Sequence, residues 1–396
     1  MDKQNTRSLW VISFVAVVNA LGYGIIIPLL YSFGKEFGIT NVQSGLLFAS
    51  FSAAQFIATP IIGRLSDKYG RKPLLVFSVL GSALSFLLFG FANSALMLFA
   101  ARILDGISGG NISVAQAVIS DLTKPKERTK WFGMLGASFG FGFLFGPAIG
   151  GILSQYSVRL PFFLAAAVSL ICALLAQFVL KESLQDKGTA RLSLGSVFNF
   201  KKVFNSLFEP FVGLLLSITF LVNIAFSIFI LGFQTFTNDS LKLPPSSVSL
   251  LFVIFGIVGL IMQGFVVGRV VKKIAEIPLL LFGVIVTAVG FGLMALSTTL
   301  LPFIGASIVV SIGNAFLAPV ITSIISKHTK AEDQGGILGI NQSYMSIANI
   351  FGPIIGGYLT IYSDQTAFVG AGIALLLAMV FVIIVSREKG RHTIDL

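Results

Sequence analysis

The stretch Phe-Gly-Pro-Ala-Ile-Gly-Gly, residues 145–151, returns as Phe-Gly-Pro-Ile-Ile-Gly-Gly at residues 351–357. Positions 145 and 351 lie 206 residues apart, and the same offset aligns Thr123-Lys124 with Thr329-Lys330. A repeat at about half the chain length predicts a fold made of two duplicated halves. Such duplication is common among transporters, which bind substrate between the repeats, and neither a membrane enzyme nor a scaffold requires it.

The composition around these stretches indicates a membrane protein. Of the 396 residues, 55% are hydrophobic and 11% are charged, whereas soluble domains carry roughly 25% charged residues. The mean hydropathy of +0.94 agrees. A water-soluble fold could not cover its surface with so few charges, so lipid must be the solvent for most of that surface.

Apolar stretches recur along the chain at the length of about 20 residues that a helix needs to cross a bilayer. They predict an all-α polytopic membrane protein with twelve transmembrane helices in two pseudo-symmetric six-helix halves. The expected spans are 9–31, 43–63, 74–92, 95–119, 131–154, 161–181, 210–236, 247–268, 277–297, 301–326, 337–361 and 366–386.

The one long connection separates the two halves. We expect an N-terminal half at residues 1–181, a cytoplasmic linker at 182–209 and a C-terminal half at 210–396. Apolar residues of the linker recur at helical spacing, which predicts a helix lying in the membrane interface. They are Leu194, Val197, Phe198, Phe204 and Leu207.

The net charge of +11 reflects membrane topology rather than nucleic-acid binding. Of the 27 Lys and Arg residues, 23 lie at the termini, in the linker or in alternate loops. Lys35, Arg159 and Lys242 lie in the opposite loops, and Arg102 lies within a span. Because basic loops face the cytoplasm, we expect a multi-pass inner-membrane protein with both termini cytoplasmic. The first apolar stretch has no A-x-A-like cleavage site and is expected to be a retained helix.

The sequence offers no set of residues for catalysis or metal binding. Cys172 is its one cysteine, and His328 and His392 have no partner at metal-ligand spacing. The nucleotide-binding pattern G-x-x-x-x-G-K-[ST] does not occur. We therefore expect no enzyme, no metal and no cofactor, with the proton gradient as energy source. The expected form is a monomer that takes a small-molecule substrate.

The loop after the second expected span, residues 63–73, reads Gly-Arg-Leu-Ser-Asp-Lys-Tyr-Gly-Arg-Lys-Pro. Gly70 permits a positive φ in a tight turn. The basic residues alone would only set the orientation of the chain. Asp67 is more informative, because an acid among four cations serves no topological purpose. It can pair with Arg71 or face a helix N-terminus.

The fourth expected span contains Arg102 and Asp105, which are three positions apart and so share one helix face. Ionisable residues inside a membrane are costly and are functional by default. Asp105 is the one carboxylate that we place well inside a span. Both residues are candidates for proton coupling, and a self-neutralising structural pair is the alternative.

The fifth expected span is rich in glycine. Glycines flatten one face of a membrane helix and permit close packing, and a proline bends it. The candidate motif consists of Gly142, Gly146, Pro147, Gly150 and Gly151. Generic helix packing is the alternative interpretation.

Polar residues near the middle of a span need either a partner or a cavity. Both explanations stay open for Asn19, Tyr23, Asn111, Gln116, Asn223, Asn314, Asn341 and Tyr344, which are candidates for the substrate path. The chain also has 39 Phe residues. A Phe-walled cavity with one acid would suit amphipathic organic compounds, including cations. It would suit sugars or phosphate esters poorly, because those need many hydrogen-bond donors or several Arg.

Together these motifs resemble the major facilitator superfamily. Residues 63–73 match its signature G-x-L-a-D-r-x-G-r-k, and residues 102–106 resemble its R-x-x-x-G element. Residues 142–151 resemble the glycine-proline motif of its drug/proton antiporter branch. The similarity covers nearly the whole chain and extends to tetracycline-efflux-like and multidrug exporters. It implies alternating access, with efflux driven by inward proton flow.

The resemblance also implies a cytoplasmic latch, formed by Asp67, Arg71 and Asp121 on a loop shaped by Gly63 and Gly70. This latch would stabilise the outward-facing state.

Two departures from the family pattern change the expectations. Asn19 stands where tetracycline exporters carry an acid, in the stretch Asn-Ala-Leu-Gly-Tyr-Gly at residues 19–24. This shifts proton coupling towards Asp105. The loop of the second half, residues 268–273, lacks the Asp and the second Gly, so we expect a one-sided latch.

The expected function is proton-coupled export of hydrophobic or amphipathic small molecules, as in multidrug or tetracycline-like efflux. A transporter for a specific metabolite or lipid precursor is the alternative, because a fold does not fix a substrate. A membrane receptor or enzyme is a distant alternative. It would need a binding domain or a catalytic constellation, and the short loops and scarce Cys and His argue against both.

Overall fold

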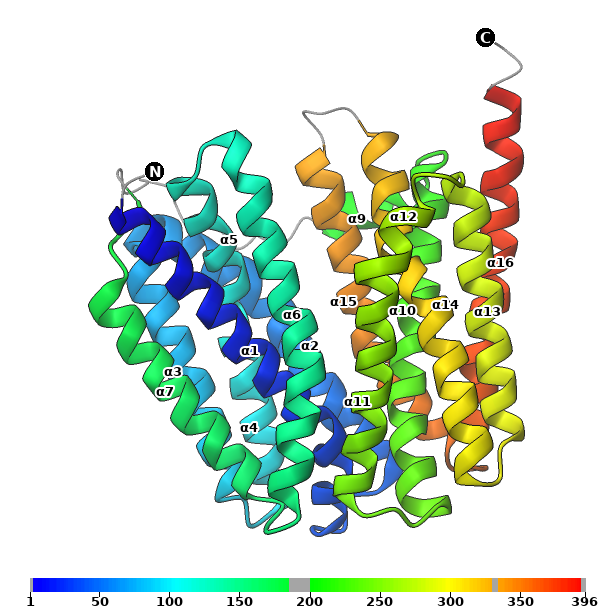
Figure 1. The fold of residues 1–396 in the computed structure, drawn as a ribbon, viewed down its shortest axis with the longest axis horizontal. Helices are drawn as coiled ribbons and strands as arrows, with labels where there is room; N and C mark the ends of the chain where they lie inside the picture. Colours follow the sequence, from blue (N-terminus) through cyan, green and yellow to red (C-terminus); the bar gives the residue numbers. More distant parts are fainter. Residues whose placement is uncertain (1–2, 185–199, 330–333, 393–396) are drawn as a thin grey trace. The chain divides into compact units, whose positions relative to one another are not determined.

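The computed structural model describes residues 3–184, 200–329 and 334–392, and all regular structure in these ranges is helical (Figure 1). The chain forms two compact units. The first unit comprises residues 1–39, 50–198 and 244–253, and the second comprises 40–49, 199–243 and 254–396. Each unit therefore includes the first residues of a long helix whose remainder belongs to the other unit.

The helices of the first half are long and apolar on most faces, as the hydropathy predicts. They are α1 (Lys3–Lys35), α2 (Asn41–Tyr69), α3 (Arg71–Gly90), α4 (Ala95–Ser108), α5 (Asn111–Leu122), α6 (Pro125–Ser154) and α7 (Leu160–Val179). Within the first unit α1 packs along α6 and α7, and α3 packs along α4, α5 and α7. Cys172 of α7 is fully buried in the core of this unit, among Leu75, Val79 and Val114.

The second half repeats this arrangement. Its helices are α9 (Phe200–Ser206), α10 (Val212–Thr235), α11 (Pro245–Ile261), α12 (Gly268–Val270), α13 (Glu276–Leu296), α14 (Leu300–Lys327), α15 (Gln334–Leu359) and α16 (Thr366–His392), with π-helical turns η1 (Phe236–Ser240) and η2 (Met262–Val267). In the second unit α10 packs on α15 and α16, and α13 packs on α14 and α16. Thus α10, α15 and α16 correspond to α1, α6 and α7 of the first unit.

The number of spans agrees with the predicted twelve. Ten helices of the described ranges are each long and apolar enough to cross a membrane. The fourth predicted span is split into α4 and α5, of 14 and 12 residues, because the helix breaks at Gly109 and Gly110. The eleventh is α15, a helix of 26 residues whose hydropathy is lowered by Asn341, Gln342 and Asn349. The predicted fold class is therefore confirmed.

The described end of the linker forms the short helix α9. Its Phe204 is 63% exposed, and the Tyr344 hydroxyl of α15 donates a hydrogen bond to the Val203 carbonyl at 2.8 Å. Leu194, Val197 and Phe198, which belong to the same predicted interfacial helix, lie outside the described residues.

Candidate functional site

A buried ion pair lies inside the first unit. Arg102 and Asp105 of α4 are 1% and 8% exposed, and Arg102 Nη1 lies 3.4 Å from Asp105 Oδ2. The guanidinium carbon of Arg102 lies 4.4 Å from the ring centroid of Phe51 on α2, a cation–π distance. Salt bridge and ring together compensate a positive charge that water cannot reach.

Gly106 explains how α2 comes so close to this pair. A Cβ atom at Gly106 would lie 2.8 Å from the Ala54 Cβ atom and would also collide with the Phe51 carbonyl oxygen. One turn beyond Arg102, the missing side chain therefore lets the two helices approach and places the Phe51 ring over the guanidinium.

An aromatic cluster extends from the ion pair. Tyr23 of α1 lies 5.8 Å from Phe51 and 5.8 Å from Phe143 of α6, measured between ring centroids. The Tyr23 side chain is 37% exposed. Phe143 is 39% exposed, whereas Phe51 is buried against Arg102. The accessible aromatic surface beside the ion pair therefore consists of Tyr23 and Phe143, which could contact an organic molecule.

Asn19 and Asn111 contact each other across α1 and α5. Asn19 Nδ2 donates to Asn111 Oδ1 at 2.8 Å, and Asn111 Nδ2 donates back to Asn19 Oδ1 at 3.3 Å. Asn111 is fully buried. Asn19 is therefore one member of an amide pair that joins two helices.

The remaining candidates for the substrate path fall into two groups. Asn341 is buried and accepts a hydrogen bond from Thr219 Oγ1 at 2.7 Å, while Asn223 donates to the Thr219 carbonyl at 2.8 Å. Tyr344 of α15 donates to the Val203 carbonyl of α9, so these three side chains all hydrogen-bond within the second unit. Gln116 is exposed on α5, and Asn314 is half-buried on α14.

The glycine-proline motif lies where α6 meets α1. A Cβ atom at Gly146 would lie 2.7 Å from the Gly24 Cα atom, and one at Gly142 would collide with the Ala20 backbone. Gly150 makes ordinary contacts with α1, Gly151 packs against Ser249 of α11, and Pro147 lies inside α6. Gly142 and Gly146 thus permit backbone-to-backbone packing in the first unit.

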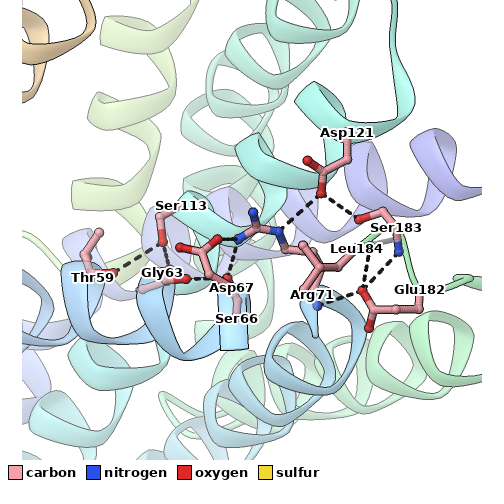
Figure 2. Close-up of polar contacts among 11 residues, drawn as sticks. Thr59, Gly63, Ser66, Asp67, Arg71, Ser113, Asp121, Glu182, Ser183 and Leu184 are labelled. Carbon is pink, nitrogen blue, oxygen red and sulfur yellow. Dashed lines mark hydrogen bonds and ion pairs between the residues drawn. The ribbon is translucent and has the colours of Figure 1, made fainter. Parts of the chain in front are cut away.

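The predicted latch residues come together at the start of α3 (Figure 2). The Arg71 guanidinium lies between two carboxylates: Nη1 is 2.5 Å from Asp67 Oδ1, and Nε is 3.3 Å from Asp121 Oδ2. Nη1 also donates to Ser66 Oγ at 2.7 Å, and Ser66 Oγ donates to the Gly63 carbonyl at 2.6 Å. Gly70, with φ of 112°, makes the turn between α2 and α3.

Two residues of this network were not predicted. The Glu182 carboxylate accepts hydrogen bonds from the backbone amides of Arg71 at 2.8 Å and Lys72 at 3.2 Å. Ser183 Oγ donates to Asp121 Oδ2 at 3.0 Å. Because Gly70 has no side chain to cap α3, Glu182 supplies the anion that a helix N-terminus favours. The sequence did contain a signal for Glu182: like Asp67, it is an acidic residue in a connection with more basic than acidic residues.

No group of three or more His, Cys, Asp or Glu side chains that could hold a metal ion occurs in the part of the chain that the structure describes. The polar contacts described above are an ion pair within α4, ion pairs that join α2, α3 and α5, and an amide pair between α1 and α5.

The duplicated helical halves and the buried ion pair define a polytopic membrane transporter. The profile of the Major Facilitator Superfamily matches residues 12–237 and 215–395. The chain belongs to this superfamily, and it is therefore a transporter and not an enzyme.

Similar proteins include multidrug and tetracycline resistance proteins. The chain is 30% identical over 394 residues to multidrug resistance protein 2 of Bacillus subtilis, covering 98% of this chain and 97% of that protein. It is 31% identical over 356 residues to the class B tetracycline resistance protein of Escherichia coli, covering 89% and 87%. The human organic anion transporter MFSD10 has the same fold, with a TM-score of 0.73 at 18% identity over 96% of this chain and 100% of that chain.

Proposed function

We propose that this protein exports amphipathic organic compounds across the inner membrane in exchange for protons. The observation that carries the proposal is the burial of Asp105 beside Arg102 in the middle of a membrane span. The multidrug and tetracycline resistance relatives support the same substrate class.

Coupling needs a group whose protonation changes which arrangement of the protein is preferred. A proton on Asp105 would remove the anion of the ion pair and leave the Arg102 charge with less compensation. A buried charge without its partner is costly, so α4 and its neighbours would favour a different arrangement. A cationic substrate at the exposed rings of Tyr23 and Phe143 would favour ionised Asp105, which makes proton and substrate competitors.

The proposed topology follows from the distribution of Lys and Arg, most of which lie at the termini, in the linker and in alternate loops. Both termini and the linker are cytoplasmic, and alternating access moves the six-helix halves, residues 1–181 and 210–396, around the substrate. Asp67, Arg71 and Asp121 then form a cytoplasmic latch that stabilises one state of the cycle.

The experiment measures accumulation of fluorescent amphipathic compounds in an efflux-deficient bacterium that expresses the protein, with and without a protonophore. The wild type should lower accumulation, and both the protonophore and Asp105→Asn should abolish this effect. Glu36→Gln is the matched control, because it also neutralises a carboxylate but at an exposed position, and it should behave as wild type.

Two results would overturn the proposal. If no compound responds although the protein is abundant in the membrane, the substrate is a specific metabolite or lipid precursor instead. If the Asp105→Asn variant exports as fast as wild type under a proton gradient, Asp105 does not couple transport.

A further inference from the structure

A second buried acid lies at the start of α13. Glu276 is 7% exposed, and its Oε1 atom accepts a hydrogen bond from Lys327 Nζ at 2.7 Å. Ser323 Oγ donates to the same oxygen. Lys327 is the last residue of α14 and Glu276 is the first residue of α13. The contact therefore joins the end of α14 to the start of α13, within the second unit.

The internal repeat relates this pair to the latch of the first unit. The offset of 206 residues carries Asp121 onto Lys327 and Gly70 onto Glu276, next to the position of Arg71. Both ion pairs therefore join the start of the third span of a half to the end of its fourth span. The charges are exchanged: the first unit has the base on the third span, and the second unit has the acid there.

The exchange of charges has a physical reason at the helix N-terminus. A carboxylate is favourable there and a cation is not. In the first unit Arg71 occupies the start of α3, and Glu182 brings the carboxylate from elsewhere in the chain. In the second unit Glu276 itself supplies the carboxylate to α13, and its ion-pair partner must then be a base.

We propose that Glu276 and Lys327 form a second latch, of reversed polarity, and act as positioning residues of the transport cycle. The expectation of a one-sided latch rested on residues 268–273, and the acid lies three residues beyond them. By holding the ends of α13 and α14 together, the pair keeps this part of the second unit rigid while the unit moves. The inference rests on the proposed transport function.

The test compares export rates over a range of substrate concentrations for Glu276→Gln, Lys327→Gln and the exchanged double variant Glu276→Lys with Lys327→Glu. Each single variant should lower the maximal rate by about threefold, the size expected for a partly exposed ion pair. The half-saturating concentration should not change. The double variant should regain part of the rate, because it restores the pair but places a cation at the start of α13.

Two controls distinguish loss of the ion pair from a general effect of charge and from misfolding. Lys273→Gln removes a positive charge from the adjacent exposed loop and should leave the rate unchanged. Lys327→Arg keeps the pair and should also keep the rate, which decides the matter if the double variant fails to accumulate in the membrane. All rates are normalised to the amount of folded protein.

The second latch and the transport proposal would fail with different results. Loss of rate in Lys327→Arg equal to that in Lys327→Gln, or a changed half-saturating concentration at an unchanged maximal rate, overturns the second latch alone. An inactive wild type overturns the transport proposal and the second latch with it.

Discussion

Glu182 accepts a hydrogen bond from the backbone amide of Arg71 at 2.8 Å, although 111 residues separate them. The side chain of the same Arg71 bridges Asp67 and Asp121. The first residues of the linker are therefore fastened to the latch, through the start of α3 and through Ser183 on Asp121.

We expect Glu182→Gln to destabilise the N-terminal half modestly. The substitution keeps the shape of the side chain and one acceptor oxygen but removes the charge at the start of α3, and a negative charge at a helix N-terminus contributes about 0.3–1 kcal/mol. Thermal unfolding of the purified protein in detergent should show a lower midpoint. Glu36→Gln is the exposed control and should not shift it. Equal midpoints for Glu182→Gln and wild type would contradict the capping role.

The latch should depend on both the geometry and the charge of its ion pairs. Arg71 uses Nη1 for Asp67 and Nε for Asp121, and a lysine has one nitrogen and cannot reproduce this fork. We expect both Arg71→Lys and Asp67→Asn to lower the maximal export rate without changing the half-saturating concentration. An Asp67→Asn variant with a raised half-saturating concentration and a wild-type maximal rate would show that the latch idea is wrong.

The amide pair of Asn19 and Asn111 should be coupled in a double-mutant cycle. Asn19→Ala leaves the buried Asn111 amide without its partner, which costs about 1–3 kcal/mol, and Asn111→Ala leaves the half-buried Asn19 amide without its partner, which should cost less. The double variant should lose less free energy of unfolding than the two single variants together, because it leaves no amide without a hydrogen-bond partner. Additive effects on the free energy of unfolding would contradict the pairing.

The glycine motif makes a prediction with an internal control. Gly146→Ala should destabilise the protein by about 1–3 kcal/mol through overpacking, because its Cβ atom would meet Gly24 at 2.7 Å. Gly136, on the same helix, has nothing within 4 Å of its Cβ position, so Gly136→Ala should be neutral or stabilising. Thermal unfolding of the two variants tests this, and an equal loss in both would show that α1 and α6 are not packed as closely as described.

Hydropathy and the repeat were sufficient to predict the helices, because most membrane spans are apolar over about 20 residues and the repeat supports the remaining ones. They did not locate the break between α4 and α5, since glycines such as Gly109 and Gly110 also occur inside unbroken helices. The pairing of Arg71 with Asp67 was predictable because four positions separate them, across the short turn at Gly70 between α2 and α3.

Contacts between distant segments were harder to predict. The sequence singled out Asn19 and Asn111 as separate candidates for a substrate path, and nothing in their spacing of 92 residues indicated a pair. Glu182 was missed because its role depends on where α7 ends and on a turn at Gly70 that supplies no cap of its own. Glu276 was missed because it lies three residues beyond the loop of the second half, residues 268–273, that corresponds to the latch loop of the first half.

The most direct test of the account is the movement of protons during transport by purified protein in vesicles that contain a pH-sensitive dye. Addition of a transported amphipathic compound should drive protons in the direction opposite to the compound, and Asp105→Asn should abolish the proton movement. Transport by the wild type with no proton movement, or proton movement that persists in the Asp105→Asn variant, would contradict coupling through the buried ion pair.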